Sequence, residues 1–259
     1  MFDSPFLAAV AANLSDPRLV AIAAVGALAG MTRGFSGFGA ALVYVPLVSA
    51  TYSPPVAAAT IFLVSLIFAT PFTIAAFPRC HWGSVLPLVL AASATVPVGA
   101  AALLLLDAKL MRWIISAIVF AGLAMLMYGR RYHAHPRLPV TLGVGAVAGI
   151  FGGAGQMSGP PVVVYWLSGP GNVATIRANL MVFFTLTSLA SGVTYLLQGL
   201  FTARALAVAA VAGPAYGLGM LVGSRLFHLA SEQTFRRIAF LIVALAALIG
   251  LPIFDRLYR

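Results

Sequence analysis

Apolar residues fill this chain in ten segments, which short polar or glycine-rich stretches separate. Several segments are long enough to cross the roughly 30 Å of hydrocarbon in a bilayer, at about 1.5 Å per residue of helix. Four segments are shorter and form two adjacent pairs, each interrupted by a glycine-rich patch. The pattern predicts a helical membrane protein. The segments cover residues 18–32, 38–50, 55–77, 84–106, 111–128, 138–154, 160–168, 173–198, 203–228 and 235–254.

The two interrupted pairs indicate an internal repeat with an offset of 119 residues. When Gly26 is placed on Gly145, VGALAGMTRGFSGFGAAL aligns with VGAVAGIFGGAGQMSGPP. Matched breaks in two halves are typical of transporters. The chain is therefore expected to consist of an N-terminal interfacial segment, a first repeat, a linker, a second repeat and a C-terminal tail. These cover residues 1–17, 18–128, 129–137, 138–254 and 255–259, in that order.

The expected fold class is all-α: a polytopic membrane protein built from two homologous helical repeats, whose first helices are broken or re-entrant. The distribution of basic loops does not decide whether the halves are parallel or inverted. Inversion is favoured, because two inverted breaks that meet at the midplane explain alternating access.

The breaks themselves point to a binding site. Unwound backbone in lipid lacks hydrogen-bond partners, so each break must be buried in protein or line a wet cavity. In QMSGPPVVVYW, Ser158 is suited to the N-cap of a half-helix and Pro160 or Pro161 to its first turn. Ser36 or Gly37 could begin the equivalent half-helix, and such N-termini attract anions. Alternatively, these glycines only allow helices to pack closely.

Composition supports the membrane assignment and limits the functions. Hydrophobic residues make up 62% of the chain and charged residues 8%, with a formal net charge of +10. The basic residues mostly lie between apolar segments, as they do beside anionic headgroups, so the lipid bilayer is the expected partner and nucleic acid is not. Homo-oligomers are also possible partners. One cysteine allows no internal disulfide.

Acidic residues are confined to termini and loops. No carboxylate lies within a predicted span, so the usual carrier of protons or sodium ions is missing and a cation pump is not expected. The histidines lie at segment ends without metal-site spacing, and no catalytic triad can be assembled at membrane depth. We therefore expect no enzyme, no metal and no cofactor. The acids are Asp3, Asp16, Asp107, Glu232 and Asp255.

Arg33 is the strongest candidate for the binding of an anion, because it lies beside the first break with no acid near it in sequence; alternatively, it extends to the membrane surface. Arg177 could face the same cavity or the surface. Thr60 and Asn179, a matched pair, could line the cavity or join helices. The candidate substrate-binding residues are Arg33, Ser36, Gly37, Phe38, Gly39, Thr60, Gly155, Gln156, Met157, Ser158, Gly159, Arg177 and Asn179.

GMTRGFSGFGAALVYVPL and GIFGGAGQMSGPPVVVYWL, with the later IRANL, resemble the paired motifs of the TauE/SafE sulfite exporter family. The resemblance covers nearly the whole chain. It implies a bacterial inner-membrane carrier of a sulfur-containing anion, such as sulfite, sulfoacetate or another organosulfonate, and export more often than uptake. Gln156, Met157 and Ser158 stand where many members have further glycines.

The function expected from all of this is a secondary transporter of such an anion that works by alternating access. An anion channel on the same scaffold and a carrier of a non-sulfur carboxylate remain open, as does a structural or receptor protein. The sequence leaves undecided the anion, the coupling ion and the direction of transport.

Overall fold

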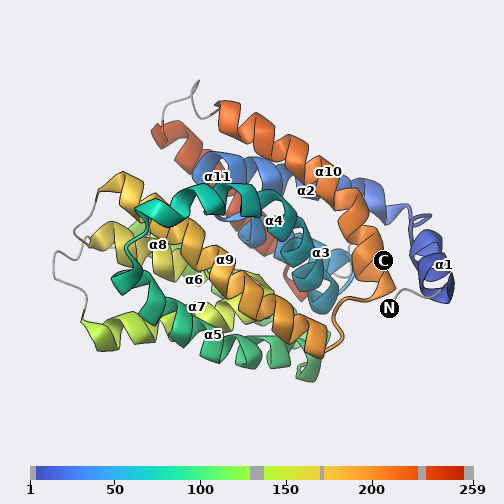
Figure 1. Cartoon of the computed structure of the whole chain (residues 1–259). Coiled ribbons are helices and arrows are strands. Elements are labelled where there is room, and N and C mark those ends of the chain that lie inside the picture. Colours follow the sequence, from blue (N-terminus) through green and yellow to red (C-terminus); the bar gives the residue numbers. More distant parts are fainter. Residues whose placement is uncertain (1–3, 129–136, 170–171, 227–231, 254–259) are drawn as a thin grey trace.

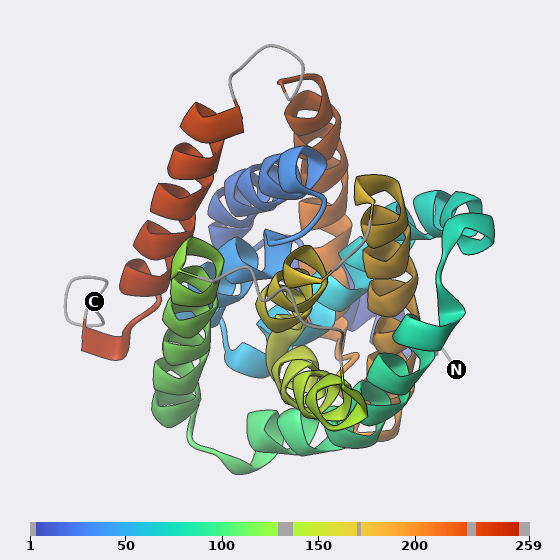
Figure 2. The same cartoon turned by 90° about the vertical axis from the view of Figure 1, so that its left-hand side faces the viewer.

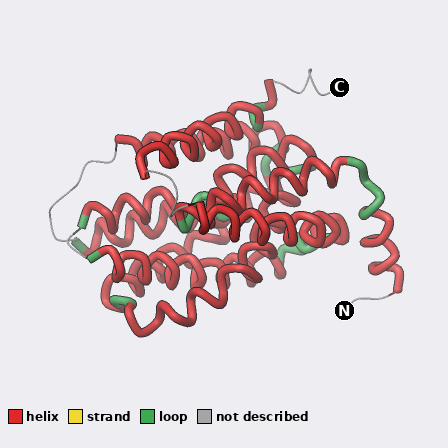
Figure 3. The backbone as a smooth tube through the Cα atoms, turned by 90° about the horizontal axis from the view of Figure 1, so that it is seen from above, coloured by secondary structure: helices red, strands yellow, loops and turns green. Residues whose placement is uncertain are grey.

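The computed structural model describes residues 4–128, 137–169, 172–226 and 232–253, and these fold into helices without a β-strand (Figure 1, Figure 3). The predicted all-helical fold is confirmed. Of the predicted linker only Arg137 is described, and the predicted tail lies outside the described residues. The helices are α1 Ser4–Asn13, α2 Arg18–Ser36, α3 Ala40–Thr51, α4 Pro54–Ala76, α5 Trp82–Leu105, α6 Ala108–Tyr128, α7 Leu138–Gly155, α8 Gly159–Ser168, α9 Val173–Leu197, α10 Ala203–Leu226 and α11 Glu232–Ile249, with a 3-10 turn, η1, at Phe77–Arg79.

The helices carry apolar side chains on the outside of the molecule. Six helices among the described residues, α2, α5, α6, α7, α9 and α10, are long and apolar enough to cross a membrane. Leu105 and Leu197 are each 82% exposed and Val20 is 79% exposed. Because water would penalise so many exposed apolar groups, the surrounding solvent is lipid. The chain is therefore a multi-pass membrane protein.

Both predicted helix breaks are present, but Ser36 and Gly37 end α2 and do not begin the next half-helix, which starts at Ala40. The first separates α2 from α3, and the second separates α7 from α8. Helices α3 and α8 begin at Ala40 and Gly159, which are 119 residues apart, and α4 and α9 begin at Pro54 and Val173, again 119 apart. The order of elements is therefore the same in both halves: a broken pair followed by three further helices.

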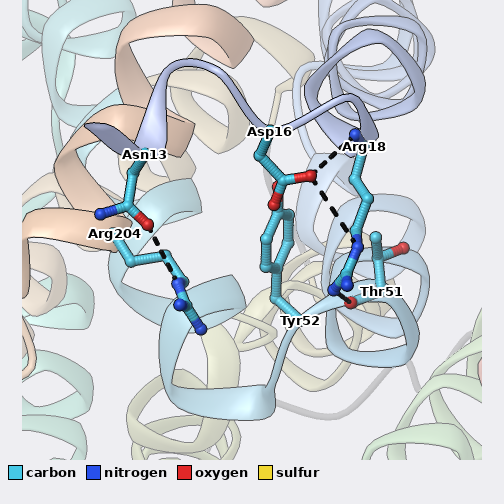
Figure 4. Close-up of polar contacts among 6 residues, drawn as sticks. All are labelled: Asn13, Asp16, Arg18, Thr51, Tyr52 and Arg204. Carbon is cyan, nitrogen blue, oxygen red and sulfur yellow. Dashed lines mark hydrogen bonds and ion pairs between the residues drawn. The ribbon is translucent and has the colours of Figure 1, made fainter. Parts of the chain in front are cut away.

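Each broken pair folds back as a hairpin. The end of α3 lies beside the start of α2, where Arg18 Nη1 donates to Thr51 O (3.5 Å) and Tyr52 Oη donates to Asp16 (2.9 Å) (Figure 4). In the second half, the hydroxyls of Thr141 on α7 and Tyr165 on α8 lie 2.6 Å apart. The break is thus the tip of the hairpin, and it is directed into the protein.

Helices α2 and α10 pack with almost no side chain between their backbones. A Cβ at Gly30 would lie 2.0 Å from Tyr216 O, and one at Gly34 would lie 2.1 Å from Met220 O. The residue numbers of the contacting pairs increase together, from Gly30 with Tyr216 to Gly34 with Met220, so α2 and α10 run parallel. Figure 1 shows both helices passing from right to left. Glycine alone permits so close an approach.

Helices α5 and α7 form the matched contact. A Cβ at Gly149 would lie 2.1 Å from Ala92 O, and one at Gly153 would lie 2.1 Å from Val96 O. This pair is also parallel and runs from left to right in Figure 1, opposite to α2 and α10. We call the α2/α10 and α5/α7 contacts the glycine seams. Each seam joins the first helix of one half to the fourth helix of the other half.

Helices α4 and α9 lie between the two seams, which Figure 2 shows at the top and bottom of the molecule. The rings of Phe62 on α4 and Tyr195 on α9 meet edge to face, with centroids 6.0 Å apart. On one side α6 packs against α11, where Ser116 Oγ donates to Ala247 O (3.0 Å) and Arg112 Nε donates to Gly250 O (3.0 Å). Helices α4 and α9 therefore occupy the centre of the molecule, and both hairpin tips are directed toward them.

The predicted N-terminal segment contains helix α1, which packs beside α10. Arg204 Nε at the start of α10 donates to Asn13 Oδ1 (3.2 Å) at the end of α1 (Figure 4). Asp16 follows in the turn to α2 and lies 3.8 Å from Arg18 Nε. These contacts fix the open end of the first hairpin.

Candidate functional site

One cavity lies between the two hairpin tips. About 620 Å³ of space lies between its lining residues when the open mouth is included. Four segments line it: the two breaks and the middles of α4 and α9. Its lining residues are Arg33, Phe38, Gly39, Ala40, Ala41, Ser65, Leu66, Gln156, Ser158, Gly159, Phe184, Thr185 and Ser188.

The first break is shaped by two glycines with left-handed backbone. Gly37 (φ 77°) ends α2 and Gly39 (φ 87°) begins α3. Ser36 Oγ donates to Thr32 O (2.7 Å) or Phe38 O (2.5 Å), and so holds the turn between the two helices. A residue with a Cβ would be strained at either glycine, so the turn follows from the sequence GFG.

Arg33 lies in the last turn of α2 and reaches the cavity. It is half-buried, and among the described residues its guanidinium makes no hydrogen bond or ion pair. Its position at a helix C-terminus suits a cation, because the helix dipole is negative there. No acidic residue is among the described lining residues. The cavity is therefore electropositive and offers the cation to an anionic guest.

The second break is closed by Gln156, whose φ is 60°. Its backbone N–H donates to Gly152 O (2.7 Å), and the next N–H, that of Met157, donates to Phe151 O (3.1 Å), the pattern that ends a helix with a left-handed residue. A left-handed conformation costs a residue with a Cβ about 1–2 kcal/mol. The matched residue in the first half is Gly37, which has no such cost.

The side chain of Gln156 is held by two neighbours. Ser188 Oγ on α9 donates to Gln156 Oε1 (3.1 Å), and Gln156 Nε2 donates to Gly152 O (3.3 Å). Beneath it, Tyr195 Oη donates to Gly153 O (2.7 Å). The carbonyls exposed by the break are thus partnered from within the protein.

Ser158 is the N-cap of α8 and is 7% exposed, and the exposed part faces the cavity. Its hydroxyl has no hydrogen-bond partner among the described residues, and it does not cap the helix. The next two helical positions after Gly159 are prolines, so this first turn has few N–H groups of its own to satisfy. A hydroxyl without a partner that lines the cavity beside the positive end of a helix points to a ligand that accepts hydrogen bonds.

Six of the sequence-predicted site residues meet at this cavity: Arg33, Phe38, Gly39, Gln156, Ser158 and Gly159. Ser36 lies behind the tip and holds the turn, while Gly37 is exposed. Gly155 and Met157 are buried behind the second tip, where a Cβ at Gly155 would lie 3.1 Å from Val45 Cγ1. The structure therefore gives the last four positions a place in the hairpin tips and not in the lining.

Thr60, Asn179 and Arg177 do not line the cavity. Thr60 Oγ1 donates to Val56 O (2.6 Å) and lies 3.5 Å from Ala205 O of α10. Asn179 Oδ1 accepts from the His81 N–H (2.8 Å) before α5. Both are buried between helices, so this matched pair joins α4 to α10 and α9 to α5. Arg177 is exposed on α9.

The lining residues that sequence reasoning missed come mostly from α4 and α9. Ser65 and Leu66 on α4 are matched by Phe184 and Thr185 on α9, again at an offset of 119 residues. Ser188 lies one turn further along α9. The signal that could have identified them is the repeat itself, since the middle of the helix after each break must face the tips. Continuous apolar sequence around them concealed their position.

The comparisons with known proteins agree with this architecture. The family model described as "Sulfite exporter TauE/SafE" matches residues 22–249. The chain is 28% identical over 231 residues to a protein of Cupriavidus necator named "Probable sulfite/organosulfonate exporter TauE", covering 84% of this chain and 88% of that protein. No solved structure matches the chain. The resemblance predicted from the paired motifs is confirmed.

Proposed function

Since the chain belongs to the TauE/SafE sulfite exporter family, we propose that it exports a small sulfur-containing anion, such as sulfite or an organosulfonate, across the bacterial inner membrane. Family membership itself makes the chain a membrane transport protein and not an enzyme. The observation that carries the proposal is the cavity between the hairpin tips, where Arg33 and Ser158 have no partner within the described residues.

The cavity has the chemistry that such an anion requires. The guanidinium of Arg33 supplies the opposite charge, and Ser158 and the start of α8 supply neutral donors from the opposite break. Phe38, Phe184 and Leu66 form an apolar part of the lining, which suits a short organic tail. An ammonium-bearing guest would find no carboxylate among the described lining residues.

We propose alternating access as the mechanism, with the two halves as inverted repeats. The matched bounds of the helices, the opposite directions of the two seams and the antiparallel course of α2 and α7 support the inversion. Because the cavity lies where both tips meet, a relative tilt of the elements on its two sides would open it first to one face of the membrane and then to the other.

A flux assay in proteoliposomes tests the proposal. Purified protein is reconstituted and the efflux of radiolabelled sulfite and ethanesulfonate is followed over a range of concentrations. A carrier gives a rate that saturates and is accelerated by substrate on the opposite side, whereas an anion channel gives neither. The absence of flux for both anions would refute the proposed transport.

A thermal-shift screen identifies the class of anion independently of flux. Sulfite, thiosulfate, sulfoacetate and taurine are compared with a carboxylate control. We expect the sulfur oxyanions to raise the melting temperature and taurine, which carries an ammonium group, to raise it least. A larger shift from the carboxylate than from every sulfur anion would replace the proposed substrate class with carboxylates.

A further inference from the structure

Gln156 occupies a backbone position that favours glycine. Its φ of 60° and the φ of 77° at the matched Gly37 describe the same left-handed turn. Among the residues that the structure describes, Gln156 is the only one other than glycine with a positive φ. Because a side chain in this left-handed conformation has a cost in backbone strain, its presence at position 156 suggests that the Gln156 side chain has a function.

The amide of Gln156 has a defined orientation. Gly152 O can only accept a hydrogen bond, so the atom of the amide that lies 3.3 Å from it is the nitrogen. The amide oxygen then accepts from Ser188 Oγ (3.1 Å), and both residues line the cavity. The amide nitrogen carries two protons and Gly152 O accepts one of them, so the second is available to a guest in the cavity or to the oxygen of Tyr195.

We infer that Gln156 is the residue by which this transporter distinguishes a sulfonate from a carboxylate, and that Ser188 is the positioning residue that fixes its amide. The inference rests on the proposed function and deepens it. Arg33 donates from one tip of the cavity, and Ser158 and Gln156 donate from the other.

The shapes of the two anions give the physical reason. The three oxygens of a sulfonate point in three directions and can meet three donors at once. The two oxygens of a carboxylate can also accept from several donors, but their lone pairs lie in one plane with the carbon, so donors arranged around the three oxygens of a sulfonate meet a carboxylate in poorer geometry. A site built for a hydrogen bond rejects a ligand that leaves the donor unpaired.

Ethanesulfonate and propanoate provide a matched pair of ligands, because they differ in the head group and share the tail. Their affinities are measured on purified Gln156→Gly, Gln156→Asn and wild-type protein, together with the melting temperature. In both variants we expect ethanesulfonate to bind roughly 10- to 100-fold more weakly, as for the loss of one hydrogen bond to a charged group, and propanoate to change less than about 3-fold. The melting temperature of Gln156→Gly should not fall, since glycine suits this turn.

Substitutions at Ser188 test the positioning role. Ser188→Ala should lower the ratio of ethanesulfonate to propanoate affinity in the same direction as Gln156→Gly, and Ser188→Thr, which keeps the hydroxyl, should restore most of it. Ser191→Ala is the control, because Ser191 is buried on the same helix, donates to Thr187 O (3.1 Å) and lies outside the cavity. Its ratio should stay that of the wild type.

Two outcomes would overturn the inference, and they can be told apart. An unchanged preference for ethanesulfonate in both Gln156 variants overturns the role of Gln156 and leaves the proposed function standing. Wild-type protein that binds sulfite but not ethanesulfonate overturns this inference alone, whereas wild-type protein that binds neither sulfite nor ethanesulfonate overturns the proposed function, and this inference with it.

Discussion

Arg33 and Gln156 show how single residues give the cavity its character. At the same place in their repeats, the first half has Arg33 and Gly37 where the second has Gly152 and Gln156. The charge and the oriented amide are thus contributed from opposite tips, and each half lacks what the other supplies. A pseudosymmetric scaffold thereby gains an asymmetric site, which a small asymmetric anion requires.

Replacement of Arg33 tests the site at the residue scale. Arg33→Ala should abolish measurable transport, because loss of one partner of a buried charge pair costs about 2–5 kcal/mol, equivalent to at least a roughly 30-fold loss of affinity. Arg33→Lys should retain part of the activity, since the charge remains. Arg177→Ala is the matched control: Arg177 is exposed outside the cavity, so its removal should leave the flux unchanged. Undiminished flux in Arg33→Ala would remove this residue from the site.

The carboxylate of Asp16 makes the open end of the first hairpin sensitive to acid. The backbone N–H of Arg18 donates to it and lowers its pKa, and Tyr52 and the charge of Arg18 act in the same direction. Burial, together with the bond to Asp16, raises the pKa of Tyr52 to about 12, so the tyrosine remains a donor throughout the physiological range.

Because the pKa of Asp16 is lower in the folded chain than in the unfolded one, its stabilising effect is complete above the ordinary aspartate pKa. It is lost as the pH falls through the depressed value. We expect the melting temperature in detergent to decline as the pH is lowered below about 4, and Asp16→Asn to reduce that decline. An identical acid dependence in Asp16→Asn would exclude Asp16 as its source.

At the scale of the helices, the glycines serve two different purposes. Gly37 and Gly39 form a break, where their left-handed backbone matters. Gly30 and Gly149 lie within continuous helices, where the absent Cβ matters, because the neighbouring backbone occupies that space. Thr95 on α5 occupies the position in the second seam that Gly219 on α10 occupies in the first. Its Oγ1 donates to Ala146 O of α7 (2.8 Å), so at this position the second seam has a hydrogen bond where the first has a close glycine contact.

Two glycines of helix α7 give a matched test of the seams. Gly149→Ala should destabilise the protein by roughly 1–3 kcal/mol, because its Cβ would overlap Ala92 O and force α5 and α7 apart. Gly143→Ala should be neutral or stabilising, by up to about 1 kcal/mol, because nothing lies within 4 Å of that Cβ and alanine favours a helix. Thermal unfolding in detergent measures both, and equal melting temperatures would contradict the seam.

At the scale of the whole molecule, the seams decide which parts can move together. α2 is fixed to α10, and α4 joins this unit through Thr60 and through Phe68, whose ring lies 2.5 Å from a Cβ built at Gly217. α7 is fixed to α5, and α9 joins through Asn179. Each unit therefore contains helices from both halves. We propose that these two units, and not the repeats themselves, tilt against each other at the α4/α9 contact.

Cross-links between paired cysteines, introduced after Cys80→Ser, test which units move. Ala91→Cys with Gly145→Cys lies within a seam, where the two Cβ atoms would be 2.9 Å apart, near the 3.5–4.5 Å of a disulfide. Phe62→Cys with Gly192→Cys lies across the α4/α9 contact. Bridging the first pair should preserve most transport, whereas a short reversible bis-thiol reagent on the second should stop it until a reductant is added. Full transport with the second pair bridged would refute this division of the molecule.

The amino-acid sequence by itself determined the membrane environment, the positions of both breaks and their equivalence. Hydropathy and the repeat of glycines are local properties of the chain, so they are visible without coordinates. The same signals identified Arg33, Gln156 and Ser158, because each lies within four residues of a break.

Only the tertiary structure decided which helices face one another. The first helix of each half packs against the fourth helix of the other half. Helices α4 and α9 are oriented so that Ser65 and Ser188 line the cavity, while Thr60 and Asn179 form hydrogen bonds to neighbouring helices. In lipid, apolar side chains are tolerated on every face of a helix, so hydropathy does not reveal the buried face. The choice of face depends on close packing between distant segments, which no local pattern of residues encodes.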